Sequence, residues 1–188
     1  PANHWANYLV TASSGAAGIM FDENHSYHST ADASGYAQLG WVFSGTEFDL
    51  TARNNYFSGG LSSVELWNWN QLTFTGNTLY NKTGLQNTLN FNAAGGQSTT
   101  NYNIGNNSYY GRNVFRFQGR NIGWDDWKLQ TGADSNSTFA LNPATPPDRV
   151  IVRPNAYEPG RANIVVYNWT LAPSVSVAVS TVLQPNDS

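Results

Sequence analysis

Residues 72–80 read Leu-Thr-Phe-Thr-Gly-Asn-Thr-Leu-Tyr, and this short stretch decides the fold. The apolar residues Leu72 and Phe74 alternate with threonines, Asn77 follows three places later, and Leu79 comes two places after the asparagine. Alternation with a period of two predicts a β-strand that buries one of its faces. An asparagine after such a strand predicts a sharp turn.

The same pattern occurs five times along the chain, which makes it an internal repeat. Its asparagines are spaced by 31, 22, 30 and 48 residues, at Asn24, Asn55, Asn77, Asn107 and Asn155. Apolar residues stand at matching offsets around each of them, as Ile19 and Phe21 do around Asn24, with Tyr27 one place late. The spacing of 22 fits one coil of a solenoid, the spacings of 30 and 31 fit a coil with an inserted loop, and the last fits two coils.

A second apolar stretch follows each asparagine and predicts a further strand. The five stretches are Ala37–Trp41, Val64–Trp67, Leu89–Phe91, Val114–Phe117 and Ile164–Tyr167. Strands this short, repeated once in each coil, predict coils that stack and share one continuous core. Each strand would pair with its equivalent in the next coil, about 4.8 Å away. The repeat therefore predicts an all-β chain wound as a parallel β-helix, which is a solenoid.

The recurring asparagine has two physical explanations. A coil needs a sharp turn between strands, and asparagine tolerates the left-handed backbone conformation better than other residues with a side chain. Asparagines stacked in successive coils can also form hydrogen bonds with one another as a ladder. We expect both at these positions, although asparagine is also simply common, with 24 in the chain.

Composition excludes several functional classes. Hydrophobic residues make up 40% and charged residues 11%, the formal net charge is -3, and the nine Lys and Arg are scattered. Without a basic stripe, nucleic acid is not an expected partner. No apolar run has the roughly 18 residues of a membrane span, and no cysteine is present. We predict no cofactor and no metal site, although Ca²⁺ held by carbonyl and Asn oxygens would leave no spacing pattern.

The stacked motifs resemble the coils of the pectate-lyase-like superfamily of right-handed parallel β-helix proteins. The segment VIVRPNAYEPGRANIVVYNW, residues 150–169, resembles a stretch near the C-terminal end of many uncharacterised bacterial β-helix proteins. The resemblance implies a right-handed solenoid, an extracellular or cell-surface location and a polysaccharide partner. It does not select one activity, because that superfamily includes lyases, hydrolases, epimerases, tailspikes and binding modules.

The prolines suggest where the coils end. Seven of the eight prolines lie at or after Pro143. We expect β-helix coils over residues 1–141, a final coil or coils over 142–170 after a proline-rich break, and a C-terminal strand or linker over 171–188 that leads toward a further β element. Open β-helix ends expose strand edges and core, so we also expect a segment of a longer chain, and self-association through such ends would follow.

The outward positions of the second strand are the candidate ligand-binding residues. If the apolar residues of that strand point inward, the polar residues between them point outward and align across coils. The candidates for binding polysaccharide are Gln38, Glu65, Trp67, Trp69, Asn90 and Arg116. Trp67 and Trp69 would share one face of a strand, about 7 Å apart, and offer a platform for sugar rings. Alternatively, loops of the longer coils cover these tryptophans.

The candidate catalytic residues are His25, His28, Arg116 and Glu65. Histidine suits general acid–base work, but a spacing of three on a strand-to-turn segment places the two rings on different sides, and turn histidines are the alternative. Arginine is the base of calcium-dependent lyases in the resembling superfamily, where acidic ligands accompany it. The adjacent acidic pairs, Asp22 with Glu23 and Asp125 with Asp126, do not form the facing carboxylates that glycoside hydrolysis needs.

Three functions remain open at this stage. The first is an extracellular protein that binds or processes polysaccharide. The second is a polysaccharide lyase or glycoside hydrolase whose catalytic residues lie partly in coils that are absent. The third is a structural or adhesive stalk built from stacked coils.

Overall fold

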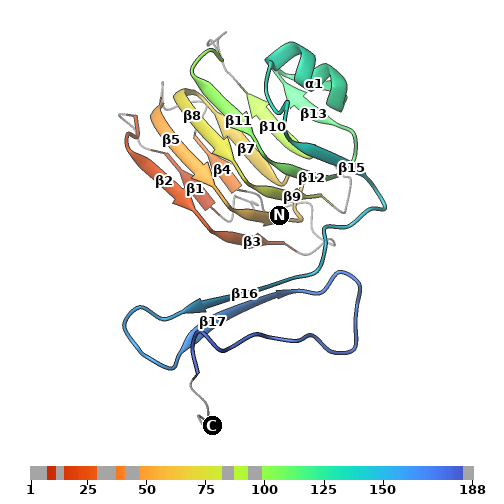
Figure 1. Ribbon diagram of the computed structural model, residues 1–188. Helices are drawn as coiled ribbons and strands as arrows, with labels where there is room; N and C mark the ends of the chain where they lie inside the picture. Colours follow the sequence, from red (N-terminus) through yellow and green to blue (C-terminus); the bar gives the residue numbers. More distant parts are fainter. Residues whose placement is uncertain are drawn as a thin grey trace, which may run out of the picture. The chain divides into compact units, whose positions relative to one another are not determined.

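The computed structural model divides the chain into two compact units, Pro1–Thr145 and Pro146–Ser188. The described residues are 8–11, 15–28, 37–40, 47–81, 87–92 and 99–183. The first unit is a β-solenoid of about four turns, which confirms the predicted parallel β-helix (Figure 1). The strand expected at Ala37–Trp41 is present over Ala37–Leu39, and Trp41 lies outside the described residues.

Each coil contributes one strand to sheet B, then one to sheet C, then one to sheet A. Sheet A contains β1 (Tyr8–Val10), β4 (Ala37–Leu39), β7 (Val64–Trp67), β10 (Leu89–Asn92), β13 (Phe115–Phe117) and β14 (Arg120–Ile122). Sheet B contains β2 (Ile19–Asp22), β5 (Glu47–Arg53), β8 (Trp69–Thr75) and β11 (Tyr102–Gly105). Sheet C contains β3 (His25–Tyr27), β6 (Tyr56–Ser58), β9 (Thr78–Tyr80), β12 (Ser108–Gly111) and β15 (Thr138–Leu141).

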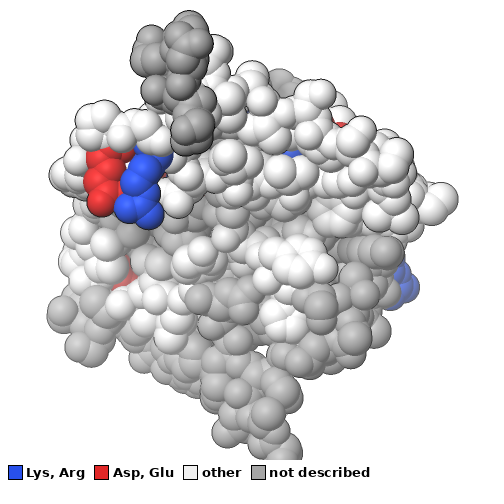
Figure 2. Space-filling view, turned by 90° about the horizontal axis from the view of Figure 1, so that it is seen from below, with Lys and Arg blue, Asp and Glu red and all other residues white. Residues whose placement is uncertain are grey.

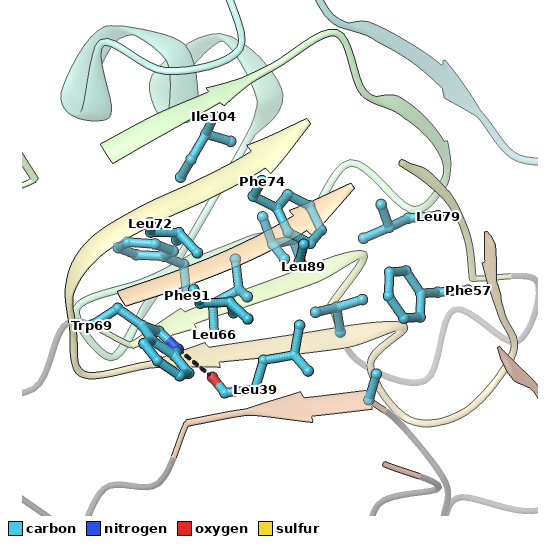
Figure 3. Packing of buried hydrophobic residues seen from close by; sticks show 14 of the residues in the cluster. Leu39, Phe57, Leu66, Trp69, Leu72, Phe74, Leu79, Leu89, Phe91 and Ile104 are labelled. Carbon is cyan, nitrogen blue, oxygen red and sulfur yellow. Dashed lines mark hydrogen bonds between the residues drawn. The ribbon is translucent and has the colours of Figure 1, made fainter. Parts of the chain in front are cut away.

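The pairing between coils is parallel throughout, and its register places like residues above one another. In sheet A the residues Ala37, Val64, Leu89 and Phe115 are paired in succession, and each is fully buried. Figure 3 shows how Leu66 from sheet A, Leu72 from sheet B and Leu79 from sheet C meet in the interior. Apolar burial of this kind is the main favourable term in folding, so the repeat stabilises the solenoid because each coil adds to one shared core.

The predicted asparagine ladder is present at the corner between sheets B and C. The Nδ2 group of Asn55 donates to Oδ1 of Asn77 (2.9 Å), and Nδ2 of Asn77 donates to Oδ1 of Asn107 (3.2 Å). The same Oδ1 atoms accept backbone N–H groups, that of Asn55 at 3.0 Å and that of Asn77 at 2.9 Å. Asn24 is the first member of the ladder, and both its backbone N–H and its Nδ2 group donate to Oδ1 of Asn55. Because the side chain of Asn77 bonds both the coil that precedes it and the coil that follows it, the ladder fixes the register of the stack.

The left-handed turn residue lies one position earlier than predicted. The residue before each ladder asparagine has a positive φ, namely Glu23 (53°), Asn54 (56°), Gly76 (68°) and Asn106 (55°). The ladder asparagines themselves are not among the described residues with a positive φ. The preceding residue therefore makes the bend, while the asparagine uses its side chain for hydrogen bonds. At Gly76 a side chain would also be crowded, because its Cβ would lie 2.8 Å from Oδ1 of Asn54.

A helix that the sequence analysis did not predict follows the last full coil. Strand β14 turns back antiparallel to β13, and α1 (Trp124–Thr131) begins directly after it. Trp127 of this helix is fully buried, with its ring centroid 5.6 Å from those of Phe91 and Phe115 and 6.0 Å from that of Phe117. The helix therefore covers the aromatic core at that end of the coil stack.

The ladder ends at a buried carboxylate beside this helix. Nδ2 of Asn107 donates to Oδ1 of Asp134 (3.1 Å), and its backbone N–H donates to Oγ of Ser137 (2.8 Å). Oδ2 of Asp134 also accepts from Tyr109 Oη (2.9 Å) and Trp127 Nε1 (2.8 Å). A buried charge is tolerated when donors surround it. Asp134 thus joins the end of the ladder to the covering helix.

The second unit corrects the prediction for residues 142–170. Strands β16 (Arg149–Pro154) and β17 (Ala162–Tyr167) pair antiparallel as a hairpin and do not form a further coil. Asn155 forms no ladder contact here, because its Oδ1 accepts the backbone N–H groups of Tyr157 and Glu158 in the turn. An alternating strand followed by an asparagine turn occurs both in a solenoid coil and in a hairpin. The sequence pattern therefore could not distinguish the two. Residues 171–183 form no strand, and residues 184–188 lie outside the described part.

We predict that Asn77→Ala lowers the free energy of unfolding by about 3 to 4 kcal/mol, because it leaves buried groups of Asn55 and Asn107 without partners. Asn70→Ala is the matched control, since Asn70 is exposed in β8, and it should change stability by less than about 0.5 kcal/mol. Urea unfolding monitored by circular dichroism measures both. Equal losses in the two variants would contradict the ladder as a stabilising element.

One fully buried and one partly buried tyrosine make stability depend on alkaline pH. Burial and the neighbouring Asp134 carboxylate raise the pKa of Tyr109 well above its ordinary value, and burial raises the pKa of Tyr102 to about 12. A group with a raised folded-state pKa contributes stability that is complete below its unfolded pKa, about 10 for tyrosine, and is lost as pH rises beyond it. We therefore expect unfolding free energy to fall between about pH 10 and 12. Urea titrations at several pH values measure the free energy of unfolding as a function of pH. Tyr102→Phe should reduce the slope of this free energy against pH, whereas Tyr157→Phe at an exposed position should not.

Candidate functional site

The outward polar residues of sheet A form the candidate site. Gln38 is paired with Glu65, Glu65 with Asn90, and Asn90 with Arg116, one from each of four successive coils. The alignment inferred from the sequence is therefore present in the structure. We call these four residues the outer row. Their inward neighbours on the same strands, such as Leu66 and Phe115, belong to the core, so alternation along the strand places the outer row on the opposite face.

The outer row is more buried than its position on an outer face suggests. Gln38 is 4% exposed, Glu65 8% and Asn90 5%, whereas Arg116 and the nearby Trp67 are partly exposed. From the sequence, covering was an alternative only for the tryptophans, so the burial of these three polar residues is a finding of the structure. A polar group buried in this way needs hydrogen-bond partners to offset the loss of water.

Glu65 is the centre of the contacts in this row. Its Oε1 accepts from Nδ2 of Asn90 (3.0 Å), and its Oε2 accepts from Nε1 of Trp67 (3.1 Å). Hydrogen bonds to a charged acceptor are stronger than bonds between neutral groups. The carboxylate therefore orients both the amide of Asn90 and the indole of Trp67. Gln38 is held separately, through a bond from its Nε2 to the carbonyl oxygen of Gly40 (3.2 Å).

Two atoms of the row are buried without a hydrogen-bond partner in the described part of the chain. They are Oδ1 of Asn90, an acceptor, and Nε of Arg116, a donor. The two residues are directly paired on neighbouring strands, which lie about 4.8 Å apart. Most buried polar atoms in native proteins are paired. An unpaired donor beside an unpaired acceptor is therefore the most distinctive chemical feature of the outer row.

Trp67 and Trp69 do not form the predicted platform. Asn68 between them has a φ of 58° and makes a corner between β7 and β8. Trp69 consequently points into the core, where it is 1% exposed and donates from Nε1 to the carbonyl oxygen of Leu39 (2.9 Å; Figure 3). Only Trp67 remains with the outer row. The rule that residues two apart share a face holds along a continuous strand, and it fails across a left-handed corner.

The histidines lie apart from the row. His25 is in β3 of sheet C, partly buried, with its ring stacked 6.4 Å from that of Tyr56. His28 follows directly after that strand. The four catalytic candidates are therefore divided between two sheets, with Glu65 and Arg116 on sheet A. Among the described residues, no group of three or more His, Cys, Asp and Glu side chains is arranged to hold a metal ion.

The two acidic pairs have structural contacts. Asp22 forms an ion pair with Arg53 of the next coil (2.8 Å), in which the arginine is about half exposed, so its contribution to stability is small. Asp125 and Asp126 occupy the first turn of α1, where a negative charge is favourable beside the helix N-terminus. Sequence reasoning missed this role because the helix itself was not predicted.

The fold and the outer row define this protein as a β-solenoid with polar residues on the outer face of sheet A. Comparison with known proteins does not assign it to a family. No family model matches the chain, and it has no match among the curated proteins or the solved structures. No helix in the described ranges is long and apolar enough to cross a membrane. The face drawn in Figure 2 carries few charged side chains among its described residues, in keeping with a charged fraction of 11%.

We predict that the two tryptophans differ sharply in their effect on stability. Trp69→Ala should lower the free energy of unfolding by about 3 to 5 kcal/mol, because it empties a core position and removes the bond to Leu39. Trp67→Ala should cost only about 1 kcal/mol, because the side chain is partly exposed. Urea denaturation curves measure the free energy of unfolding of both variants. Similar costs for the two variants would mean that both rings occupy equivalent surroundings.

Proposed function

We propose that this chain is an extracellular or cell-surface β-helix protein of the pectate-lyase-like type that binds polysaccharide. The glycan contacts Asn90 and Arg116 of the outer row of sheet A, together with the nearby Trp67. One observation carries the proposal: Oδ1 of Asn90 and Nε of Arg116 are buried on paired strands, and neither has a partner in the described structure.

A sugar hydroxyl is chemically matched to these two atoms. A hydroxyl donates one hydrogen and accepts through its lone pairs, so a single group can donate to Asn90 and accept from Arg116. Each buried polar atom left unpaired costs about 1 to 3 kcal/mol. A ligand that forms hydrogen bonds with both atoms recovers that energy, which favours binding at the paired residues Asn90 and Arg116 over binding elsewhere on sheet A.

Trp67 supplies the apolar contact that sugar recognition also needs. Its indole is partly exposed, and the bond from Nε1 to Glu65 holds the ring in one orientation. Pyranose rings present C–H faces that pack against aromatic surfaces, and sugar sites combine such a surface with a few polar groups. Arg116 is partly exposed as well, so the ligand approaches the row from the side of these two residues.

The chemistry of the row favours binding over cleavage. Glu65 is the single carboxylate of the four residues, and it already accepts two hydrogen bonds. Glycoside hydrolysis uses two carboxyl groups on either side of the scissile bond. The histidines that could act as a base lie on or next to β3, in another sheet. We therefore propose recognition of a glycan by this row, without a cofactor and without bond cleavage.

Affinity electrophoresis in native gels, each containing one plant or algal polysaccharide, tests the proposal on the full chain. We expect at least one glycan to retard migration. Trp67→Ala and Asn90→Ala should weaken the apparent affinity about tenfold or more, which corresponds to about 1.4 kcal/mol. Asn70→Ala removes an exposed amide from sheet B and should have no effect.

Two outcomes would contradict the proposal. Absence of retardation by every glycan would remove polysaccharide binding, provided that circular dichroism shows a folded protein. Release of reducing or unsaturated sugars from a retarding glycan would replace binding alone with hydrolase or lyase activity.

A further inference from the structure

The two ends of the coil stack differ in structure. At one end, α1 covers the core. At the other end, sheets A, B and C all terminate at the first coil, where β1, β2 and β3 are their edge strands in the described part of the chain (Figure 1). Edge strands carry backbone N–H and C=O groups that can pair with another strand. We call these three strands together with Asn24 the first-coil end.

Asn24 is the first asparagine of the ladder, and one atom of its side chain has no partner. Oδ1 of Asn55 accepts from Asn24 in the preceding coil, and Oδ1 of Asn77 accepts from Asn55 in the same way. Oδ1 of Asn24 accepts no hydrogen bond from the described residues. Asn24 is also only partly buried, whereas Asn55 and Asn77 are buried. The ladder therefore ends here in an acceptor that can receive another donor.

The Nδ2 group of Asn24 indicates the same vacant position. Nδ2 of Asn55 donates to the carbonyl oxygen of Phe21 in the preceding coil (2.8 Å), and Asn77 bonds to its own preceding coil in the same way. Nδ2 of Asn24 instead donates to the carbonyl oxygen of Asp22 in its own coil (3.1 Å). A local bond thus replaces the bond that the next asparagines make to a preceding coil.

The apolar interior is less covered at the first-coil end. Val10 and Ile19 pack against the core but are only partly buried. Leu39 and Leu50, which are paired with them in the next coil, are buried. Removing apolar surface from water is favourable. A further coil over Val10 and Ile19 would therefore gain the same core contacts that hold the later coils together.

These features specify the chemistry of a partner. The acceptor of Asn24 requires a donor, the edge of β2 requires an extended strand, and the core requires apolar side chains at alternate positions. A segment with the pattern of the repeat meets all three requirements. Its asparagine would donate through its backbone N–H and Nδ2, as Asn24 does to Asn55. Its strand would run parallel to β2, as β5 does on the other side.

A second copy of this chain does not provide the required donor. At the far end of the ladder, Ser137 stands in the asparagine position, and its N–H and its Oγ both donate to Asp134. Two copies that met at their first-coil ends would place one Oδ1 of Asn24 against the other. Both are acceptors, and acceptors do not bond to each other.

We propose that the first-coil end binds a partner segment that forms one further β-helix coil. The segment runs parallel to β2 and carries an asparagine that donates to Oδ1 of Asn24. Its apolar residues bury Val10 and Ile19. This surface continues the coil-to-coil interface of the solenoid, and the proposal does not depend on the function proposed for the outer row.

Fluorescence anisotropy on the full chain tests the proposal with a labelled peptide that copies residues 47–58, the repeat around Asn55. We expect saturable binding of one peptide per chain. The peptide with Asn55→Ala has no side-chain donor for Asn24 and should bind about five- to tenfold more weakly. Equal affinity of the two peptides would overturn the proposal.

Two variants of the chain test the acceptor. Asn24→Ala removes Oδ1 and should weaken binding of the peptide by a similar factor. Asn70→Ala removes an exposed amide from β8 and should leave the affinity unchanged.

Met20→Pro tests the strand edge separately and covers the case in which Asn24→Ala does not fold. The carbonyl oxygen of Phe21 accepts from Asn55 in the next coil. Backbone groups alternate in direction along a strand, so the N–H of Met20 in β2 points away from that coil. Proline is tolerated at such an edge position. The variant should therefore fold and should lose binding of the peptide.

Three results would overturn the proposal besides equal affinity of the peptides. The first is no saturable binding of the peptide to the folded chain. The second is binding like that of the wild type by Asn24→Ala and Met20→Pro, with circular dichroism showing that both are folded. The third comes from sedimentation velocity of the chain alone: a dimer that Met20→Pro dissociates would make a second copy the partner.

Discussion

The hydrogen-bonded ladder of asparagine side chains is the constraint on which the rest of the solenoid depends. Each buried amide bonds to the next coil and, through Nδ2, to a backbone carbonyl of the preceding coil, as Asn77 does with the oxygen of Ala52 (3.1 Å). A shift of one residue in any coil would break several of these bonds and turn the side chains of the strands to opposite faces. The ladder therefore sets the register in sheets B and C, and through it the stacking in sheet A.

The end of the ladder shows how such a repeat is closed. In the fifth coil Ser137 takes the place of the asparagine. Nδ2 of Asn107 donates one hydrogen to the oxygen of Phe74, and the carboxylate of Asp134 accepts the hydrogen that the next asparagine would otherwise take. The same carboxylate bonds to Trp127, which covers the core. The carboxylate of Asp134 therefore both ends the asparagine ladder and holds the tryptophan that covers the core.

The outer row of sheet A presents the opposite physical situation. In the ladder, donors and acceptors are matched, whereas in the outer row the carboxylate of Glu65 is satisfied but one acceptor and one donor beside it are not. A buried polar network that is only partly satisfied costs stability. A ligand that supplies the missing groups would offset that cost, which is the physical basis for the recognition that we propose at this row.

The sequence by itself determined the coil, the ladder and the alignment of Gln38, Glu65, Asn90 and Arg116, because these follow from short periodic patterns within each repeat. Only the tertiary structure decided that Trp69 enters the core, because one backbone angle at Asn68 sets the direction of the chain after the corner. It also decided that three of the four residues of the outer row are buried, that α1 covers the core, and that Asn155 lies in a hairpin turn. Burial and chain reversal depend on segments far apart in the sequence, whose contacts leave no local pattern.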